Sequence, residues 1–302
     1  WTIAPPPNSA SNFSWYIGTG LTPTDGTGPY GGYQSENYLY TEGNWGNAPT
    51  SAVLISECMD LTGLTNPYVD FMYHFYAADA AALVFQVKPE TGNNFQSVGG
   101  AILGSNANQT MSSEFDEWKL RHIDLSAFVG QTVQLRIVCQ KTGGGQEADV
   151  AIDGFRVYDQ AAQDVGILTI TSPGGSINLP GGSGPTVKIQ NFGSAAVTSV
   201  PLQLTVTPSC GGAPISVSDT WTGTLQPGAS VNHTISTPPG YVLGAQEICV
   251  STGLSADGYS FNDTYCKYAT GFTDQTIPFS TDFESCDRDE HGFAIMGNSG
   301  GT

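Results

Sequence analysis

Basic residues and long apolar runs are both scarce in this sequence. Its 302 residues include 9 lysines and arginines against 27 acidic residues, which gives a formal net charge of −18. A surface this acidic repels nucleic-acid phosphates and anionic lipids, and no cluster of Lys or Arg is present, so we expect no nucleic-acid partner. No apolar stretch approaches the ~20 residues of a membrane span, so we expect no membrane insertion. No signal peptide begins at Trp1, as expected of a mature or trimmed chain.

Helical periodicity is also scarce. The run DAAALVFQV could form a short helix, but its Leu83, Phe85 and Val87 alternate with other residues, and the preceding YVDFMYHFYA alternates as well. A period of two predicts strands rather than helices. Further strands, separated by Gly, Pro, Asn and Asp, are expected at residues 37–42, 53–56, 118–123, 133–139 and 150–158. Many short strands at such spacing predict a β-sandwich or barrel.

The character of the sequence changes near Asp159. From Val165 to Tyr268 the pattern is strand, turn, strand, and Pro-Gly pairs stand at several of the turns. Seven such strands in about a hundred residues predict an immunoglobulin-like β-sandwich.

A third pattern begins near Thr276. The segment GFAIMGNSGGT repeats features of FSWYIGTGLTPT near the N-terminus, which predicts the first strands of a second copy of the first fold. The last ~25 residues cannot bury a core of their own, so we expect the chain to be part of a longer modular protein. The predicted domains are a jelly-roll sandwich at residues 1–160, an immunoglobulin-like sandwich at 161–270, and a linker with the first strands of a truncated jelly roll at 271–302.

Six cysteines are present, without a C-x-x-C pair or a histidine at zinc spacing. We therefore expect structural disulfides formed in an oxidising compartment, with free buried thiols as the alternative. Cys58 and Cys139 are the only two in the first domain, and a bond between them would close a long loop and stabilise the fold. In the second domain Cys249 can pair with either Cys210 or Cys266, and the sequence does not choose.

Asp153 lies within ADVAIDGFRVYD, between Ile152 and Phe155 of a predicted strand. An unpaired buried carboxylate is unfavourable, so this side chain should be paired, hydrogen-bonded or bound to a metal ion. The alternative to a metal is that Asp153 accepts hydrogen bonds from backbone N–H groups at the strand end.

Aromatic residues crowd the early segments of the first domain. Alternate members such as Tyr38 and Tyr40 should face the core, whereas Tyr30, Tyr33 and Trp45 lie among Gly, Asn and Pro. We expect these three to be more exposed and to face a ligand, because aromatic surfaces with amide and carboxylate neighbours bind sugars and protein partners.

Signatures of catalysis are weak. Glu114 and Asp116 in SSEFDEWKL lie two apart, as in the paired carboxylates of jelly-roll glycosidases, but Lys119 stands where such enzymes carry a third acid. We interpret this segment as a solvated loop. The sequence GGSGP around Ser183 lacks a flanking glycine of a nucleophile elbow, and no H-E-x-x-H motif is present. We expect a partly buried, hydrogen-bonded imidazole at His74 and no catalytic residue in this region.

Residues 13–159 resemble MAM and related concanavalin-like jelly-roll modules. The resemblance rests on LTPTDGTGP, YLYTEGN, AVLISECMDLTG, YVDFMYHFYA and WKLRHIDLSAFVGQTVQLRIVCQKTG, closed by DVAIDGFRVY, in the order of the family. The closing motif of the family usually has two adjacent acids, whereas here Gly154 follows Asp153. The cysteine pattern is reduced, and an opening DFE is found only at residues 282–284.

The resemblance implies a structural Ca²⁺ ion, held in part by the acid of the last strand. Because Ca²⁺ takes six to eight oxygen ligands, carboxylates and carbonyls from separate loops have to converge on it. Asp153, Glu42 and Asp25 are the expected ligands, with backbone carbonyls of residues 25–32. No other cofactor is expected.

Residues 164–268 resemble the CARDB-type adhesion module of bacterial surface proteins, through VGILTI, PTVKIQNFGSAAVTSVPLQLTV and GTLQPGASV. The alternation of the two modules is similar to large bacterial surface proteins exported by the type IX secretion route. This implies an extracellular, cell-surface adhesin or scaffold that binds glycans or other surface proteins, with a secretion or outer-membrane machinery as a further partner. The alternative is an accessory region of a secreted hydrolase, such as a peptidase or glycosidase, whose active domain lies elsewhere.

Overall fold

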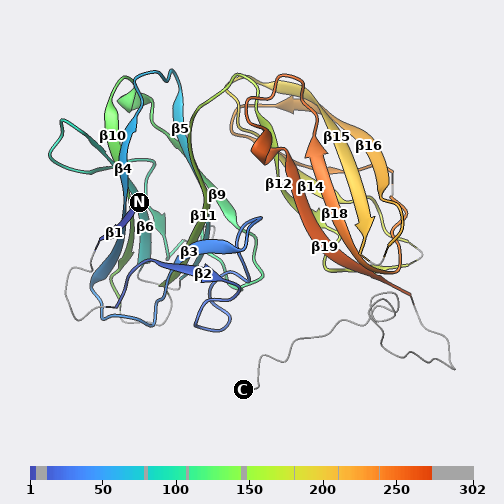
Figure 1. Cartoon of the computed structure of the whole chain (residues 1–302), viewed down its shortest axis with the longest axis horizontal. Coiled ribbons are helices and arrows are strands. Elements are labelled where there is room, and N and C mark those ends of the chain that lie inside the picture. The colour runs from blue at the N-terminus through green and yellow to red at the C-terminus, as the bar shows by residue number, and fades with distance from the viewer. Residues whose placement is uncertain are drawn as a thin grey trace. The chain divides into compact units, whose positions relative to one another are not determined.

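A computed structural model describes residues 1–4, 12–77, 81–106, 109–143, 148–179, 181–209, 211–237 and 239–273. Apart from two short 3-10 turns, the regular elements of these residues are β-strands, which confirms the prediction of an all-β sandwich protein. The chain divides into two compact units, Trp1–Asp159 (unit 1) and Gln160–Thr302 (unit 2) (Figure 1). In the described part of the chain, no helix has the length and apolar character needed to cross a membrane. Most of the predicted third domain, from residue 274 on, lies outside the described residues.

Unit 1 consists of two antiparallel sheets in which strands distant in sequence are neighbours (Figure 1). The first sheet has the order β1-β4-β10-β6-β7, with β8 also paired to β6, and the second has the order β2-β3-β11-β5-β9. The strands of the first sheet are β1 (Thr2–Ala4), β4 (Thr50–Asp60), β10 (Thr132–Lys141), β6 (Ala81–Pro89), β7 (Gln96–Ser97) and β8 (Ile102–Leu103). The strands of the second are β2 (Tyr16–Thr19), β3 (Asn37–Thr41), β11 (Ala148–Asp159), β5 (Pro67–Ala77) and β9 (Lys119–Asp124).

The core of unit 1 follows from alternation along its long strands. Phe71 and Phe75 of β5 lie in one buried cluster with Leu135 and Ile137 of β10, so the two sheets share a single core. Side chains with a period of two point to one face of a strand, and large or β-branched residues fit that half-buried surface. Complete burial of one such side chain contributes about 1.5–3 kcal/mol.

Asp153 lies on the face of β11 opposite to the core residues Val150 and Ile152, and a bulge follows it. The pairing of β11 with β5 shifts between Asp153, which lies opposite Met72, and Arg156, which lies opposite Asp70. Gly154 lies within the shift at a φ of +58°, a left-handed conformation that glycine adopts without strain. The extra residue allows the residues on both sides of the bulge, Ile152 and Phe155, to pack on the core.

Unit 2 has a three-stranded sheet, β12-β14-β17, and a five-stranded sheet, β13-β19-β18-β15-β16, in which β13 and β19 pair in parallel. Figure 1 labels most of these strands. Ile167 and Ile189 of the first sheet share a buried core with Leu204 and Val250 of the second, as in a β-sandwich. The strands are β12 (Val165–Ser172), β13 (Ser176–Asn178), β14 (Thr186–Asn191), β15 (Val197–Pro208), β16 (Ile215–Leu225), β17 (Ser230–Thr234), β18 (Gly244–Thr252) and β19 (Thr264–Phe272).

The predicted disulfide between Cys58 and Cys139 is wrong, because both cysteines are free. Their strands are neighbours, but Cys58 lies opposite Gln134 and Cys139 lies opposite Ala52. Gln134 and Cys139 are therefore about 17 Å apart along β10, whereas bridged cysteines have Cα atoms at most about 7 Å apart. Cys139 belongs to the core of unit 1, and burial raises the pKa of its thiol to about 12. Cys139 is therefore a free buried thiol, which was the alternative to a disulfide.

Unit 2 contains the disulfide Cys249–Cys266. The two residues lie directly opposite each other on the antiparallel strands β18 and β19, which brings their side chains to one face of the sheet. This is one of the two pairings that the sequence leaves open for Cys249. Cys210 and Cys286 lie outside the described residues.

Removal of this disulfide is expected to destabilise unit 2. The bond joins residues 17 positions apart, and the chain-entropy model gives about 3 kcal/mol for a loop of this length. Denaturant unfolding of the Cys249→Ala/Cys266→Ala variant should show a loss of this order. The exposed Cys58 provides the control, since Cys58→Ala should unfold as the wild type does. Equal stability of the double variant and the wild type would contradict the prediction.

Candidate functional site

Two buried carboxylates meet where β3 leads into the loop that follows it. Thr41 of β3 lies opposite Val150 of β11, and because the strands are antiparallel, the residue after Thr41 and the residue before Val150 are adjacent. These residues are Glu42, which is 0% exposed, and Asp149, which is 1% exposed. Two carboxylates removed from water are unfavourable unless hydrogen bonds and opposite charge compensate them.

Hydrogen-bond donors from two loops surround Glu42. Its Oε1 accepts hydrogen bonds from Thr24 Oγ1 at 2.6 Å and from Asn44 N at 3.2 Å. Its Oε2 accepts one from Thr24 N at 3.2 Å. Glu42 thus fixes the loop after β2 to the loop after β3.

Asp149 and Lys141 extend this network. Gly43 N donates to Asp149 Oδ1 at 2.5 Å, and Thr27 Oγ1 donates to Asp149 Oδ2. The ammonium of Lys141 is buried and donates to the carbonyl oxygens of Gly43 and Gly46. We call Glu42, Asp149 and Lys141 the carboxylate cluster.

The charges of the carboxylate cluster do not cancel. Burial raises the pKa of Asp149 to about 7, and Glu42 adds to the rise, while hydrogen bonds from Gly43 and Thr27 oppose it. Burial lowers the pKa of Lys141, while Asp149 and Glu42 oppose that shift. Two carboxylates and one ammonium leave a single negative charge when all are ionised. The cluster therefore favours a further positive charge, either a proton on Asp149 or a bound cation.

The donor atoms of the cluster fit a hard divalent cation. Ca²⁺ prefers oxygen ligands, carboxylates above all, and the two carboxylates here lie beside hydroxyl oxygens of Thr24 and Thr27. Glu42 is one of the ligands expected from the sequence. Asp149 was not singled out, although it stands in the same closing motif as Asp153, because its closeness to Glu42 depends on the register of β3 with β11.

The structure does not bring Asp153 and Asp25 into this cluster. Asp153 Oδ2 accepts hydrogen bonds from Tyr33 N at 2.8 Å and from Ser35 Oγ at 2.9 Å, and its Oδ1 accepts one from Gly154 N at 2.7 Å. Asp153 thus accepts hydrogen bonds from two backbone N–H groups and one hydroxyl, while a metal ion at Asp153 or Asp25 stays a prediction. Asp25 is exposed on the loop after β2.

A second group of metal-ligating residue types is found in unit 2. Within the described ranges, Glu247, Cys249 and Cys266 are the single set of three acidic, His or Cys residues whose ligand atoms lie within 4.8 Å of one another. Both cysteines are joined in the disulfide, so they have no thiolate to offer.

An exposed pair of aromatic rings lies on two loops of unit 1. Tyr30 is 63% exposed and Phe115 is 71% exposed, and their ring centroids are 5.5 Å apart with 31° between the planes. Tyr30 N donates to Glu114 O at 3.0 Å, and Trp118 Nε1 donates to Gly31 O at 3.2 Å, so the two loops are joined at two points. We call these rings the Tyr30–Phe115 pair.

The other two rings expected to face a ligand are partly buried. Trp45 packs edge-on against Tyr16, with ring centroids 4.8 Å apart, and the ring of Tyr33 lies beside Gly154. From the sequence, only the acids of SSEFDEWKL were considered, and no role was predicted for Phe115. A large apolar residue between two acids in a predicted loop could have indicated an exposed ring at this position.

The contacts of His74 and His122 in unit 1 suit structural roles. His74 is fully buried, and burial lowers its pKa to about 4, so its imidazole is neutral near pH 7. His122 Nδ1 lies 2.5 Å from Asp70 Oδ1, while Arg156 donates to Asp70 Oδ2 from Nη2 at 2.8 Å. Asp70, His122 and Arg156 come from three neighbouring strands, so this ion pair network joins β5, β9 and β11.

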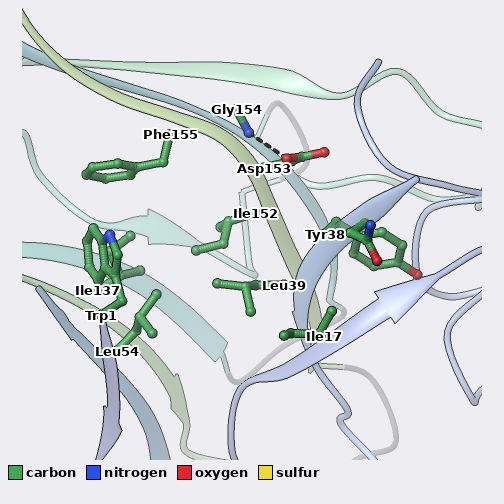
Figure 2. A pocket seen from close by; sticks show the side chains of 11 residues that line it. Trp1, Ile17, Tyr38, Leu39, Leu54, Ile137, Ile152, Asp153, Gly154 and Phe155 are labelled. Atoms are coloured by element: carbon green, nitrogen blue, oxygen red, sulfur yellow. Dashed lines mark hydrogen bonds between the residues drawn. The ribbon is translucent and has the colours of Figure 1, made fainter. Parts of the chain in front are cut away.

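An apolar pocket of about 350 Å³ lies between the two sheets of unit 1. It is lined by Trp1, Ile17, Asn37, Tyr38, Leu39, Leu54, Ile137, Ile152, Asp153, Gly154 and Phe155. Figure 2 shows the Ile152 and Leu39 side chains facing this space, whereas the Asp153 carboxylate points to the other side of β11. Sugars need several hydrogen-bonding partners, and the aliphatic and aromatic side chains of this lining do not supply them, so the pocket suits an apolar group.

The raised pKa of Asp149 predicts that unit 1 loses stability as the pH rises from about 4 to about 7. The unfolded carboxyl ionises near 3.8, whereas the folded one keeps its proton up to about pH 7, so the folded state binds more protons in this window. Asp149→Asn should lack this part of the pH dependence. Each pKa unit corresponds to about 1.4 kcal/mol, so the wild type should lose a few kcal/mol relative to the variant.

Denaturant unfolding in metal-free buffer at several pH values between 4 and 8 measures this difference. Asp153→Asn is the matched control, because Asp153 lies outside the carboxylate cluster, and it should keep the wild-type slope. Parallel pH profiles for the wild type and Asp149→Asn would show that the prediction is wrong.

Solved structures of glycoside hydrolases show a low similarity to the chain. The glycoside hydrolase domain of Endo-D from Streptococcus pneumoniae R6 is 9% identical, with 85% of this chain and 37% of that chain covered and a TM-score of 0.35. A β-glucuronidase from Parabacteroides merdae is 12% identical, with 76% and 29% covered and a TM-score of 0.38. A β-galacturonidase from Eisenbergiella tayi is 10% identical, with 89% of this chain and 43% of that chain covered and a TM-score of 0.36. The chain spans less than half the length of these structures, and similarity at this level carries no argument.

The family model of the MAM domain (meprin/A5/mu) matches residues 7–161, just over half of the chain. The match covers almost all of unit 1, including Glu42, which follows β3, and Asp149 of β11. MAM domains occur in extracellular and cell-surface proteins. On this match the chain belongs to the MAM domain family.

Proposed function

We propose that this chain is a non-catalytic binding region of a secreted, cell-surface protein, with an adhesive or scaffolding role toward glycans or partner proteins. The observation that carries the proposal is the Tyr30–Phe115 pair, which a module of the MAM family displays on two joined loops. Exposed aromatic rings supply large contact areas and recur at the centres of binding sites. The resemblance of unit 2 to CARDB-type adhesion modules, and of the combination to type IX secreted proteins, supports the same role.

The contacts of Asp116 in SSEFDEWKL support a binding loop rather than a glycosidase site. Asp116 Oδ2 accepts hydrogen bonds from Ser112 N at 2.7 Å and from Ser113 N at 3.1 Å. Burial acts to raise the pKa of Asp116, but these hydrogen bonds outweigh it and lower the pKa. The general acid of a glycosidase needs a raised pKa instead, so Asp116 suits a role in shaping the loop.

We also propose that the carboxylate cluster binds Ca²⁺, with Glu42 and Asp149 as its charged ligands. A divalent cation supplies the positive charge that the cluster favours, and its oxygen ligands come from loops that are separate in sequence. The ion would hold residues 24–27 against β11. Those residues belong to the loop that carries Tyr30, so bound Ca²⁺ would also stabilise the proposed binding surface.

Calcium is expected to raise the melting temperature of the chain. A ligand present at ~100 times its Kd adds about 2.7 kcal/mol to stability, which corresponds to several degrees. Thermal unfolding of the wild type should therefore shift downward when EDTA replaces excess Ca²⁺. Glu42→Gln and Asp149→Asn should lose the shift, while Asp153→Asn should keep it. A wild-type melting temperature that EDTA leaves unchanged would rule out the proposed ion.

Loss of the two rings is expected to weaken ligand binding without unfolding the protein. The wild-type chain should bind members of a glycan array or a panel of extracellular proteins, and Tyr30→Ala/Phe115→Ala should bind them at least about tenfold more weakly. Phe261→Ala is the matched control, because Phe261 of unit 2 is 83% exposed and also lies beside a tyrosine. If every ligand of the wild type binds the double variant equally well, the proposed role of the pair is wrong.

A further inference from the structure

We propose that the Tyr30–Phe115 pair binds a lysine or arginine side chain within a basic segment of a partner protein. This inference rests on the proposed binding function and names the chemistry of the partner at the same site. It commits to a cationic protein ligand rather than to a neutral glycan.

The geometry of the two rings suits a cation. Both rings are more than half exposed, their centroids are 5.5 Å apart, and their planes differ by 31°, so an ammonium or guanidinium group can contact the face of one ring and the edge region of the other. Cations are attracted to the faces of aromatic rings within about 6 Å of the centroid. The aliphatic part of a lysine or arginine side chain can cover the remaining apolar surface.

The charges on the two loops select for such a ligand. Residues 20–36 and 111–118 contain five acidic residues and no lysine or arginine, namely Asp25, Glu36, Glu114, Asp116 and Glu117. The Glu114 carboxylate reaches the first loop, since a Cβ atom at Gly26 would lie 3.9 Å from its Oε2. The nearest basic residue in sequence, Lys119, donates to Thr110 O at 3.1 Å. A surface with this charge attracts cationic segments and repels acidic ones, while a neutral sugar gains nothing from it.

Hydrogen bonds join the two loops that carry the rings. Tyr30 is joined to the second loop through the Tyr30 N–Glu114 O hydrogen bond, and the Trp118 indole donates to Gly31 O next to Tyr30. The Trp118 ring itself packs edge-on against Tyr38, which is buried. Because these contacts link the two loops, a partner has fewer loop conformations to restrict on binding, which favours affinity.

Isothermal titration of the full-length chain with short synthetic peptides tests the inference. One peptide carries lysines and arginines spaced by Gly and Ser, a second has glutamates at the same positions, and a third has glutamines. The basic peptide should bind, and the other two should not. Tyr30→Ala and Phe115→Ala should each weaken binding about threefold or more, while Phe261→Ala should not change it. Both rings are largely exposed, so these variants should keep the wild-type melting temperature.

Salt and charge variants separate the rings from the acidic surface. Glu114→Gln should weaken binding, and so should a rise in NaCl from about 50 mM to about 500 mM. Binding of the basic peptide that is identical in Tyr30→Ala and Phe115→Ala overturns the inference, because the acidic surface alone then accounts for it. Absence of peptide binding, together with ring-dependent binding of glycans, also overturns it but leaves the proposed binding function standing. If neither class of ligand depends on the rings, the proposed function fails as well.

Discussion

Strand β11 lies between β3 and β5 in the second sheet of unit 1, and its register with these strands fixes the chemistry of the unit (Figure 1). The pairing with β3 places Asp149 beside Glu42, and alternation along β11 puts Asp153 on the face opposite to Ile152, where it contacts Tyr33 and Ser35. A shift of one residue would exchange core-facing and loop-facing side chains along the whole strand, so the buried Val150 and Ile152 hold the register in place. The apolar core thus positions both carboxylates, although neither carboxylate belongs to it.

The few basic residues of unit 1 act within the fold. Lys119, Arg121 and Lys141 donate to backbone carbonyls, and Arg156 donates to Asp70. These hydrogen bonds stabilise the fold of unit 1. Acidic residues outnumber basic ones along the chain, and the resulting negative potential favours cations over anions as partners. The proposals for a calcium ion and for a basic protein segment both follow from this distribution.

The two units differ in how they are stabilised. Unit 1 combines a large aromatic and aliphatic core with polar networks around Glu42, Asp149 and Asp70, and its two described cysteines are free. Unit 2 has a core of mostly Val, Ile and Leu and joins its last two strands through Cys249–Cys266. The polar networks of unit 1 tie loops to strands, and those same loops display the Tyr30–Phe115 pair.

Sequence patterns alone were sufficient to predict the all-β class, because alternation with a period of two and the turn residues act locally along the chain. The resemblance of residues 13–159 to MAM modules also depended on local motifs, and the family match agrees with it. The pairing of cysteines, the meeting of Glu42 with Asp149 and the contact of Tyr30 with Phe115 were beyond the sequence, since each joins residues from distant segments. Which strands are neighbours, and in which register, depends on packing of the whole core. Only the tertiary structure therefore decided that Cys58 and Cys139 lie too far apart to bond and that Asp149, rather than Asp153, lies beside Glu42.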